Sequence, residues 1–225
     1  MVEQLIQRWE RVTPAWEPRG AVSGYFAGLD LGQAHDYTAL AVVEAAETKG
    51  AWDAARFCFA RHRELRLRHL ERMPLGRPYP EMAARTVHVM GCRALDGAPR
   101  HLAVDATGVG RPVVDLLRER KPACTLWPAL ITGGDAEGCV DGYYRVPKRS
   151  LLVGLQVMLQ SNELRIAADV PEAEALVREM SAMRVEVTDE GRDSWRSGAH
   201  DDLVFAVALA CWVAKKGRGT TRDWW

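Results

Sequence analysis

Apolar residues in the first third of the chain form short runs separated by turn residues, a pattern typical of β-strands. Two runs, residues 25–29 and 38–44, flank a turn predicted at residues 32–36, so we expect a β-hairpin here. A third strand is predicted at residues 56–61, where polar and apolar residues alternate. A dense basic run at residues 63–72 follows and is expected to form a solvated surface.

Helical and strand patterns alternate from residue 78 onwards. A helix is predicted from Pro80 to about residue 93, then a strand at residues 101–105 and a helix that begins at Pro112. A further strand is predicted at residues 124–131. Residues 147–160 carry leucine and methionine at helical spacing, which predicts a helix with one face in the core.

The remaining elements complete this alternation. We expect a short strand at residues 164–167, a helix at 171–180, a hairpin at 184–195 that turns at Glu190-Gly191, and a last helix after His200. Three antiparallel strands continued by two parallel ones, with helices on both faces, make a mixed sheet of the α/β class. This is the ribonuclease H-like order of elements.

The length and composition favour one domain. The 225 residues are 48% hydrophobic, enough for a sizeable core. We assign this domain to residues 25–214 and treat residues 1–24 as a linker or docking segment that begins with a short amphipathic helix. Residues 215–225 form a basic tail that ends in Trp224 and Trp225, side chains that often dock into a partner.

Charge and cysteine content exclude several classes of protein. Lys and Arg together number 30, as do Asp and Glu, so the net charge of 0 indicates neither a nucleic-acid nor an acidic partner. The five cysteines include no C-x-x-C pair, and no signal segment is evident, which points to a reducing cytoplasm. No apolar run approaches the ~18 residues of a membrane span, so we expect no membrane partner.

Carboxylates at the ends of apolar runs are the strongest functional feature. Asp30 and Asp105 each close a predicted strand, and Asp201 and Asp202 precede the last helix. Because the carboxyl ends of neighbouring strands converge on one crevice in an open α/β sheet, these side chains can meet and bind divalent metal. The structural alternative is that each is a turn residue, or that Asp201 is simply a helix N-cap.

Five short motifs in succession give the chain a resemblance to a known family. They are Gly28-Leu29-Asp30-Leu31-Gly32, Val104-Asp105-Ala106-Thr107-Gly108-Val109-Gly110, Ile131-Thr132-Gly133-Gly134, Val146-Pro147-Lys148-Arg149 and His200-Asp201-Asp202-Leu203. Together they resemble the nuclease domain of the large terminase subunit of tailed bacteriophages. The resemblance covers residues 25–214.

This resemblance implies a metal-dependent endonuclease that cuts concatemeric phage DNA during genome packaging. Two Mg²⁺ or Mn²⁺ ions can clamp the attacking and leaving oxygens of a phosphodiester. Asp30 would bridge both ions, Asp105 would hold one, and Asp202 or Asp201 would complete the other site, with Asp202 preferred. The implied partners are double-stranded DNA, a terminase ATPase domain, the small terminase subunit and the portal, in the host cytoplasm.

Three neighbouring positions are candidates for support of the metal ligands. His200 is either a ligand that assists a water molecule or a structural histidine. Thr107 and Gly108 follow Asp105, and glycine there permits close approach of substrate, although a plain strand-to-helix turn uses the same residues.

Basic residues supply candidate DNA contacts. Lys148 and Arg149 lie at a helix start, where cations oppose the macrodipole, so phosphate contact is a reason for them. Arg66 and Arg68 belong to the basic run, which is either a solvated face or a surface that follows DNA.

Other classes of protein stay open on the sequence. The chain contains no G-x-x-x-x-G-K-[ST] motif, so it departs from a full-length large terminase, which joins an ATPase to this nuclease. Asp30-Leu31-Gly32 also resembles the first phosphate turn of the actin and sugar-kinase superfamily, which binds ATP. A Holliday-junction resolvase or transposase of the same fold, and a non-catalytic DNA-binding or docking module, are the remaining alternatives.

Overall fold

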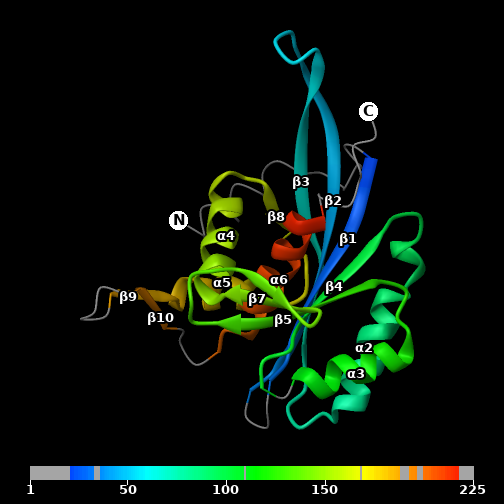
Figure 1. Cartoon of the computed structure of the whole chain (residues 1–225), viewed down its shortest axis with the longest axis vertical. Coiled ribbons are helices and arrows are strands. Elements are labelled where there is room, and N and C mark those ends of the chain that lie inside the picture. The colour runs from blue at the N-terminus through cyan, green and yellow to red at the C-terminus, as the bar shows by residue number, and fades with distance from the viewer. Residues whose placement is uncertain are drawn as a thin grey trace.

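An eight-stranded mixed sheet forms the centre of the molecule (Figure 1). The computed structural model describes residues 21–32, 36–108, 110–167, 169–187, 193–196 and 200–217. The strands lie in the order β6-β7-β5-β4-β1-β2-β3-β8. Their bounds are β1 (Ala21–Asp30), β2 (Thr38–Asp53), β3 (Cys58–Met73), β4 (Arg100–Asp105), β5 (Thr125–Thr132), β6 (Gly138–Val140), β7 (Tyr143–Pro147) and β8 (Leu164–Ile166).

The strand directions match the predicted fold class. β1, β2 and β3 are successively antiparallel, as the pairs Gly28 with Ala41 and Leu40 with Glu71 illustrate. β4, β5 and β7 continue the sheet from β1 in parallel, while β8 runs parallel to β3 at the far edge. The chain therefore has the ribonuclease H-like mixed sheet that the sequence predicts.

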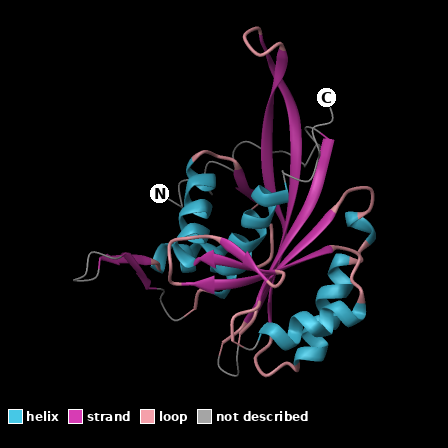
Figure 2. Cartoon of the chain, in the orientation of Figure 1, coloured by secondary structure: helices cyan, strands magenta, loops and turns pink. Residues whose placement is uncertain are grey.

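Helices cover both faces of this sheet (Figure 2). α2 (Tyr79–Met90) and α3 (Gly110–Arg120) pack on one face, and α4 (Lys148–Gln160), α5 (Ala173–Ala182) and α6 (Asp202–Lys216) pack on the other. A 3₁₀ turn, η1 (Arg93–Leu95), follows α2. β9 (Arg184–Val187) and β10 (Asp193–Arg196) form a separate antiparallel ribbon, and its predicted turn at Glu190-Gly191 lies outside the described residues.

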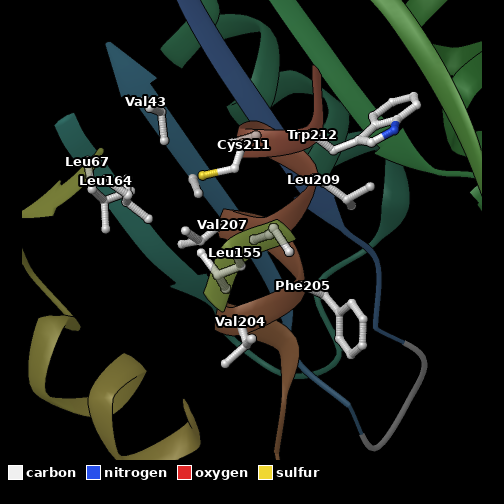
Figure 3. Close-up of a cluster of buried hydrophobic side chains, with 14 of the residues drawn as sticks. Val43, Leu67, Leu155, Leu164, Val204, Phe205, Val207, Leu209, Cys211 and Trp212 are labelled. Carbon is white, nitrogen blue, oxygen red and sulfur yellow. The ribbon is translucent and has the colours of Figure 1, made fainter. Parts of the chain in front are cut away.

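Helix α6 is the central element of the larger core. Every side chain from Asp202 to Ala214 is buried, including large ones such as Leu209 and Trp212. Figure 3 shows Val204, Val207 and Cys211 on this helix beside side chains from β2, β3 and α4. A helix that is apolar on all sides requires neighbours on all sides, which explains its position between the sheet and α4 and α5.

A glycine permits the close contact between α6 and β1. A Cβ added at Gly28 would lie 2.0 Å from the carbonyl oxygen of Ala206 and 2.6 Å from the amide nitrogen of Ala210. Both atoms belong to the helix backbone, so a side chain here would force α6 away from the sheet. This contact matters because α6 begins with Asp202 and β1 ends with Asp30.

The predictions for residues 56–61, as a short strand, and for residues 63–72, as a solvated surface, were wrong. The third strand is not confined to residues 56–61, because β2 and β3 extend into a long projecting ribbon and the basic run lies within β3. Leu65, Leu67 and Leu70 of that run are fully buried, and this apolar set holds the arginines between them in a strand.

The sequence pattern also missed β6 and β7. β6 has three exposed residues and no periodic signal, and β7 ends in Pro147, which disfavours a strand assignment. Three parallel strands therefore follow β1 in place of the expected two.

Candidate metal centre at the carboxyl edge of the sheet

Asp30 and Asp105 lie at adjacent strand ends. β1 and β4 are paired in parallel, with Leu29 opposite Val104, and each Asp is the next and last residue of its strand. Asp201 and Asp202 join them because α6 packs across β1 near Gly28. Asp30 and Asp201 are about 170 positions apart in the sequence, yet both lie at the carboxyl edge of the sheet.

Asp30 is surrounded by other negative charges. Burial raises the pKa of Asp30 well above its usual value, and the negative charges of Asp105, Asp201, Asp202 and Glu179 raise it further. A cluster of like charges around a buried carboxyl is unfavourable unless cations or protons neutralise it. Bound cations or protons would therefore stabilise this cluster of carboxylates.

Asp105 is held by the turn that follows it. Its Oδ1 accepts a hydrogen bond from the backbone N–H of Thr107 at 2.8 Å, and burial raises its pKa although this hydrogen bond opposes the rise. The Thr107 hydroxyl accepts a hydrogen bond from the N–H of Ile131 at 2.9 Å, which ties the turn to β5. Thr107 thus orients Asp105 in this structure.

Two glycines allow the same turn to close. Gly108 has a φ of +59°, in the left-handed region that glycine tolerates best. A Cβ on Gly110 would lie 2.0 Å from the carbonyl oxygen of Asp105. The conformation of the turn therefore explains the presence of glycine at both positions. Close approach of a substrate at Gly108 stays a prediction.

Asp202 is buried and paired with an arginine. Its Oδ2 accepts a hydrogen bond from Nε of Arg72 at 2.7 Å, and the residue is 5% exposed. The same guanidinium donates to Oε1 of Glu179, whose Oε2 accepts the N–H of Leu203 at 3.1 Å. Burial and the charge of Asp202 raise the pKa of Glu179 to about 7, against the lowering effect of Arg72.

Asp201 has a different environment from Asp202. It is the N-cap residue of α6 but makes no side-chain hydrogen bond to the helix, so the simple capping role is not what its side chain performs. Its Oδ2 lies 3.8 Å from Nζ of Lys148, and about a third of the side chain is exposed. His200 is exposed, with its ring edge-on to Tyr37 at 5.3 Å between centroids.

The predicted metal ligands lie at one edge of the sheet, and three of the four have an oxygen in contact with a protein group. Within the described ranges, no three His, Cys, Asp or Glu side chains are placed to hold one metal ion as they stand. Asp202 accepts a hydrogen bond from Arg72, and Asp105 accepts one from the N–H of Thr107. Asp201 forms an ion pair with Lys148. The donor set is nonetheless all oxygen and crowded with negative charge, which suits hard divalent cations.

The candidate DNA contacts separate into two groups. Lys148 is half-buried and Arg149 exposed, both in the first turn of α4 beside Asp201. Arg66 is only 3% exposed and forms ion pairs with Glu44 and Glu64, so its prediction as a DNA contact was wrong. Arg68 is 30% exposed and pairs with Glu44 at 2.9 Å.

Sequence reasoning missed Glu179 and the role of Arg72. Glu179 follows Leu176 and Val177 on the buried side of α5, so a carboxylate at a core position was the available signal. Buried carboxylates need a partner, and Arg72 lies in the basic run that was assigned to the surface. Neither signal reveals that the two residues meet.

Comparison with solved structures finds this fold in terminase nuclease domains. The terminase nuclease domain of human cytomegalovirus, soaked with Mn and with an inhibitor bound, superimposes with a TM-score of 0.55 at 13% identity over 94% of both chains. The large terminase nuclease domain of bacteriophage SPP1 with bound Mn gives 0.50 at 12% identity, over 86% of this chain and 88% of that one.

A third structure extends the comparison to a longer chain. The large terminase of bacteriophage HK97 matches with a TM-score of 0.51 at 13% identity, over 94% of this chain and 42% of that one. No family model and no curated protein matches the sequence. The chain thus has the fold of large terminase nuclease domains. In the part of the chain that is described, no helix has both the length and the apolar character of a membrane span.

Proposed function

We propose that this chain is a metal-dependent endodeoxyribonuclease domain that hydrolyses phosphodiester bonds of concatemeric phage DNA during genome packaging. The observation that carries this proposal is the crowding of carboxylates at one edge of the sheet, where Asp30 and Asp105 end adjacent parallel strands and Asp201 and Asp202 lie at the start of α6. Such crowding has no structural benefit in the metal-free protein, because like charges in a buried place destabilise it. It is explained if the site exists to bind Mg²⁺ or Mn²⁺.

Each carboxylate has a role that follows from its position. Asp30, Asp105 and Asp202 or Asp201 would together hold two divalent cations. Bound cations of this kind supply the Lewis acidity that activates water and neutralises the leaving oxygen. Asp202 is preferred as ligand because it is the more deeply buried of the two, whereas Asp201 is partly exposed.

The side chains around the carboxylates have supporting roles in the proposal. Thr107 fixes Asp105 through its backbone N–H, which restricts the orientation of the carboxylate. Lys148 and Arg149, at the start of α4, would contact the DNA phosphates next to the scissile bond. His200, which is exposed and precedes Asp201 in the sequence, would assist a water molecule.

The proposed partners follow from the fold that the chain shares. Structures of this fold include viral terminases, so we infer that double-stranded DNA is the substrate and that the domain works with a terminase ATPase domain, the small terminase subunit and the portal. The nuclease unit would comprise residues 25–214, with residues 1–24 and 215–225 as connecting or docking segments. Its place of action would be the host cytoplasm.

Plasmid cleavage tests this proposal. Supercoiled plasmid is incubated with the protein in Mg²⁺, in Mn²⁺ or in chelator, with isothermal titration of Mn²⁺ run in parallel. Wild type should nick and linearise the plasmid only with metal. Asp30→Asn and Asp105→Asn should abolish cleavage and weaken Mn²⁺ binding, while Asp115→Asn, which changes an exposed Asp of α3, should do neither.

The outcomes separate the alternatives. Plasmid that stays intact with both metals, but shifts in a gel, would favour a non-catalytic DNA-binding module. Preferential cutting of branched DNA would favour a resolvase-like or transposase-like enzyme. Stabilisation against heat by Mg-ATP, without a response to Mn²⁺ alone, would favour the ATP-binding reading.

A further inference from the structure

Arg72 lies in register with the candidate metal centre. Asp30 of β1 pairs with Ala39 of β2, and Ala39 pairs in turn with Arg72 of β3. Residues directly opposite each other in antiparallel strands point to the same face of the sheet. Asp30 and Arg72 therefore share the face that α6 covers, two strands apart, or roughly 10 Å at ~4.8 Å per strand.

The guanidinium of Arg72 connects three elements at this point. Its Nε donates to Oδ2 of Asp202 at 2.7 Å, and its Nη2 donates to Oε1 of Glu179. The side chain is 18% exposed and lies 4.9 Å above the ring of Tyr37. β3 is thereby tied to α5 and to the first turn of α6.

Glu179 fixes the other side of this arrangement. One of its oxygens accepts from Arg72, and the other accepts the backbone N–H of Leu203 at 3.1 Å. Leu203 is the neighbour of Asp202, so Glu179 holds the backbone that carries the carboxylate while Arg72 holds the carboxylate itself. The backbone and the side chain of Asp202 are thus held by two different residues.

We propose that Arg72 is a positioning residue for the candidate metal centre, and that it acts by fixing Asp202 through Oδ2 so that Oδ1 is presented to a cation shared with Asp30. This inference rests on the proposed function. Partners that orient a metal-ligating carboxylate commonly matter for metal affinity as much as its charge does. The planar guanidinium is essential to this role, because its Nε and Nη2 donate to Asp202 and Glu179 at the same time. A lysine ammonium keeps the charge but lacks two nitrogens in this fixed, forked arrangement.

Mn²⁺ titration of the full chain tests the inference without a cleavage readout. Arg72→Lys preserves the charge and removes the fork, and Arg72→Met removes both. We expect each to lower Mn²⁺ affinity by about tenfold or more relative to wild type, the usual effect of losing such a partner. Glu179→Gln, which weakens the anchor of Arg72, should lower it in the same direction.

A matched arginine provides the control. Arg85 of α2 forms a comparable fork with Glu71 of β3, at 2.7 Å, but Glu71 is not part of the carboxylate cluster. Arg85→Lys should therefore leave Mn²⁺ affinity within about twofold of wild type. Circular dichroism of each variant identifies any that fails to fold, and Glu179→Gln then carries the test.

The possible results divide cleanly. If Arg72→Lys binds Mn²⁺ as wild type does, positioning by the fork is refuted. If Arg72→Met binds more tightly than wild type, Arg72 competes with the cation, and the inference is overturned in favour of that reading. If wild type binds no Mn²⁺, the proposed function itself fails and this inference fails with it.

Discussion

Replacement of Gly28 by alanine tests whether the contact between α6 and β1 builds the candidate site. The new Cβ would lie 2.0, 2.6 and 2.9 Å from the Ala206 oxygen, the Ala210 nitrogen and the Leu209 Cβ. Two of these atoms are helix backbone, which cannot rotate away as a flexible side chain can. The helix must shift outward, and a shift at its middle displaces Asp202 at its start.

The expected magnitude follows from the severity of this overlap. Overpacking a core costs about 1–3 kcal/mol, and overlap with backbone belongs at the upper end, near 3 kcal/mol. For a chain of this size, 1 kcal/mol corresponds to about 2–4 °C in Tm, so Gly28→Ala should lower Tm by about 6–12 °C. Its Mn²⁺ affinity should fall as well, because Asp202 moves relative to Asp30.

A second glycine provides a control, because its replacement by alanine should raise stability. Gly154 lies inside α4, and a Cβ there meets nothing within 4 Å. Gly154→Ala should therefore stabilise the protein by about 0.5–1 kcal/mol through helix propensity. Thermal unfolding followed by circular dichroism measures both variants. A Gly28→Ala protein that melts within about 2 °C of wild type would show that α6 does not pack on β1 as described.

Three further predictions follow from the buried titratable groups. Asp30→Asn should raise the free energy of unfolding of the metal-free protein at pH 7, since it removes a buried charge crowded by other carboxylates; urea denaturation in chelator checks this, and a loss of stability would contradict it. Glu179 has a pKa raised to about 7, so between pH 4.5 and about 7 the folded state binds more protons than the unfolded state, and stability falls as pH rises through that interval. Urea denaturation of wild type and Glu179→Gln at both ends of this interval measures the decrease in the free energy of unfolding. The decrease should be about 1–2 kcal/mol smaller in the variant, after allowance for solvent screening. An equal decrease in the two proteins would refute the raised pKa. Cys211 is buried and its pKa is raised to about 12, so a thiol reagent should leave it unmodified in the folded protein while exposed Cys58 and Cys92 react; rapid labelling of Cys211, read by mass spectrometry, would argue against the packing of α6.

The sequence predicted those parts of the fold that have a local signal. Short apolar runs at residues 25–29 and 38–44 located the first hairpin, and Asp30 and Asp105 were recognised because each directly follows an apolar run. Helix α6 was expected after His200 because its residues are continuously apolar. Such features depend on neighbours in the sequence, which can be read without knowledge of the fold.

The parts that the sequence did not predict depend on contacts between distant residues. Arg66 and Arg72 occur in one basic run, yet Arg66 is neutralised by Glu44 and Glu64 while Arg72 reaches Asp202 and Glu179. Charge density alone cannot show which arginine of a strand meets which carboxylate, because that depends on strand register and on the position of α5 and α6. The metal role of the four Asp residues stays a prediction until it is measured.

Helix α6 follows every strand of the central sheet in the sequence, and this order has a consequence during synthesis. A chain emerging from the ribosome carries Asp30 and Asp105 before it carries Asp201 and Asp202, which lie at the start of α6. The sheet can pair earlier, but its largest apolar face stays uncovered until this helix inserts. A nascent chain would therefore gain its full acidic cluster and the cover of this sheet face together, when α6 inserts.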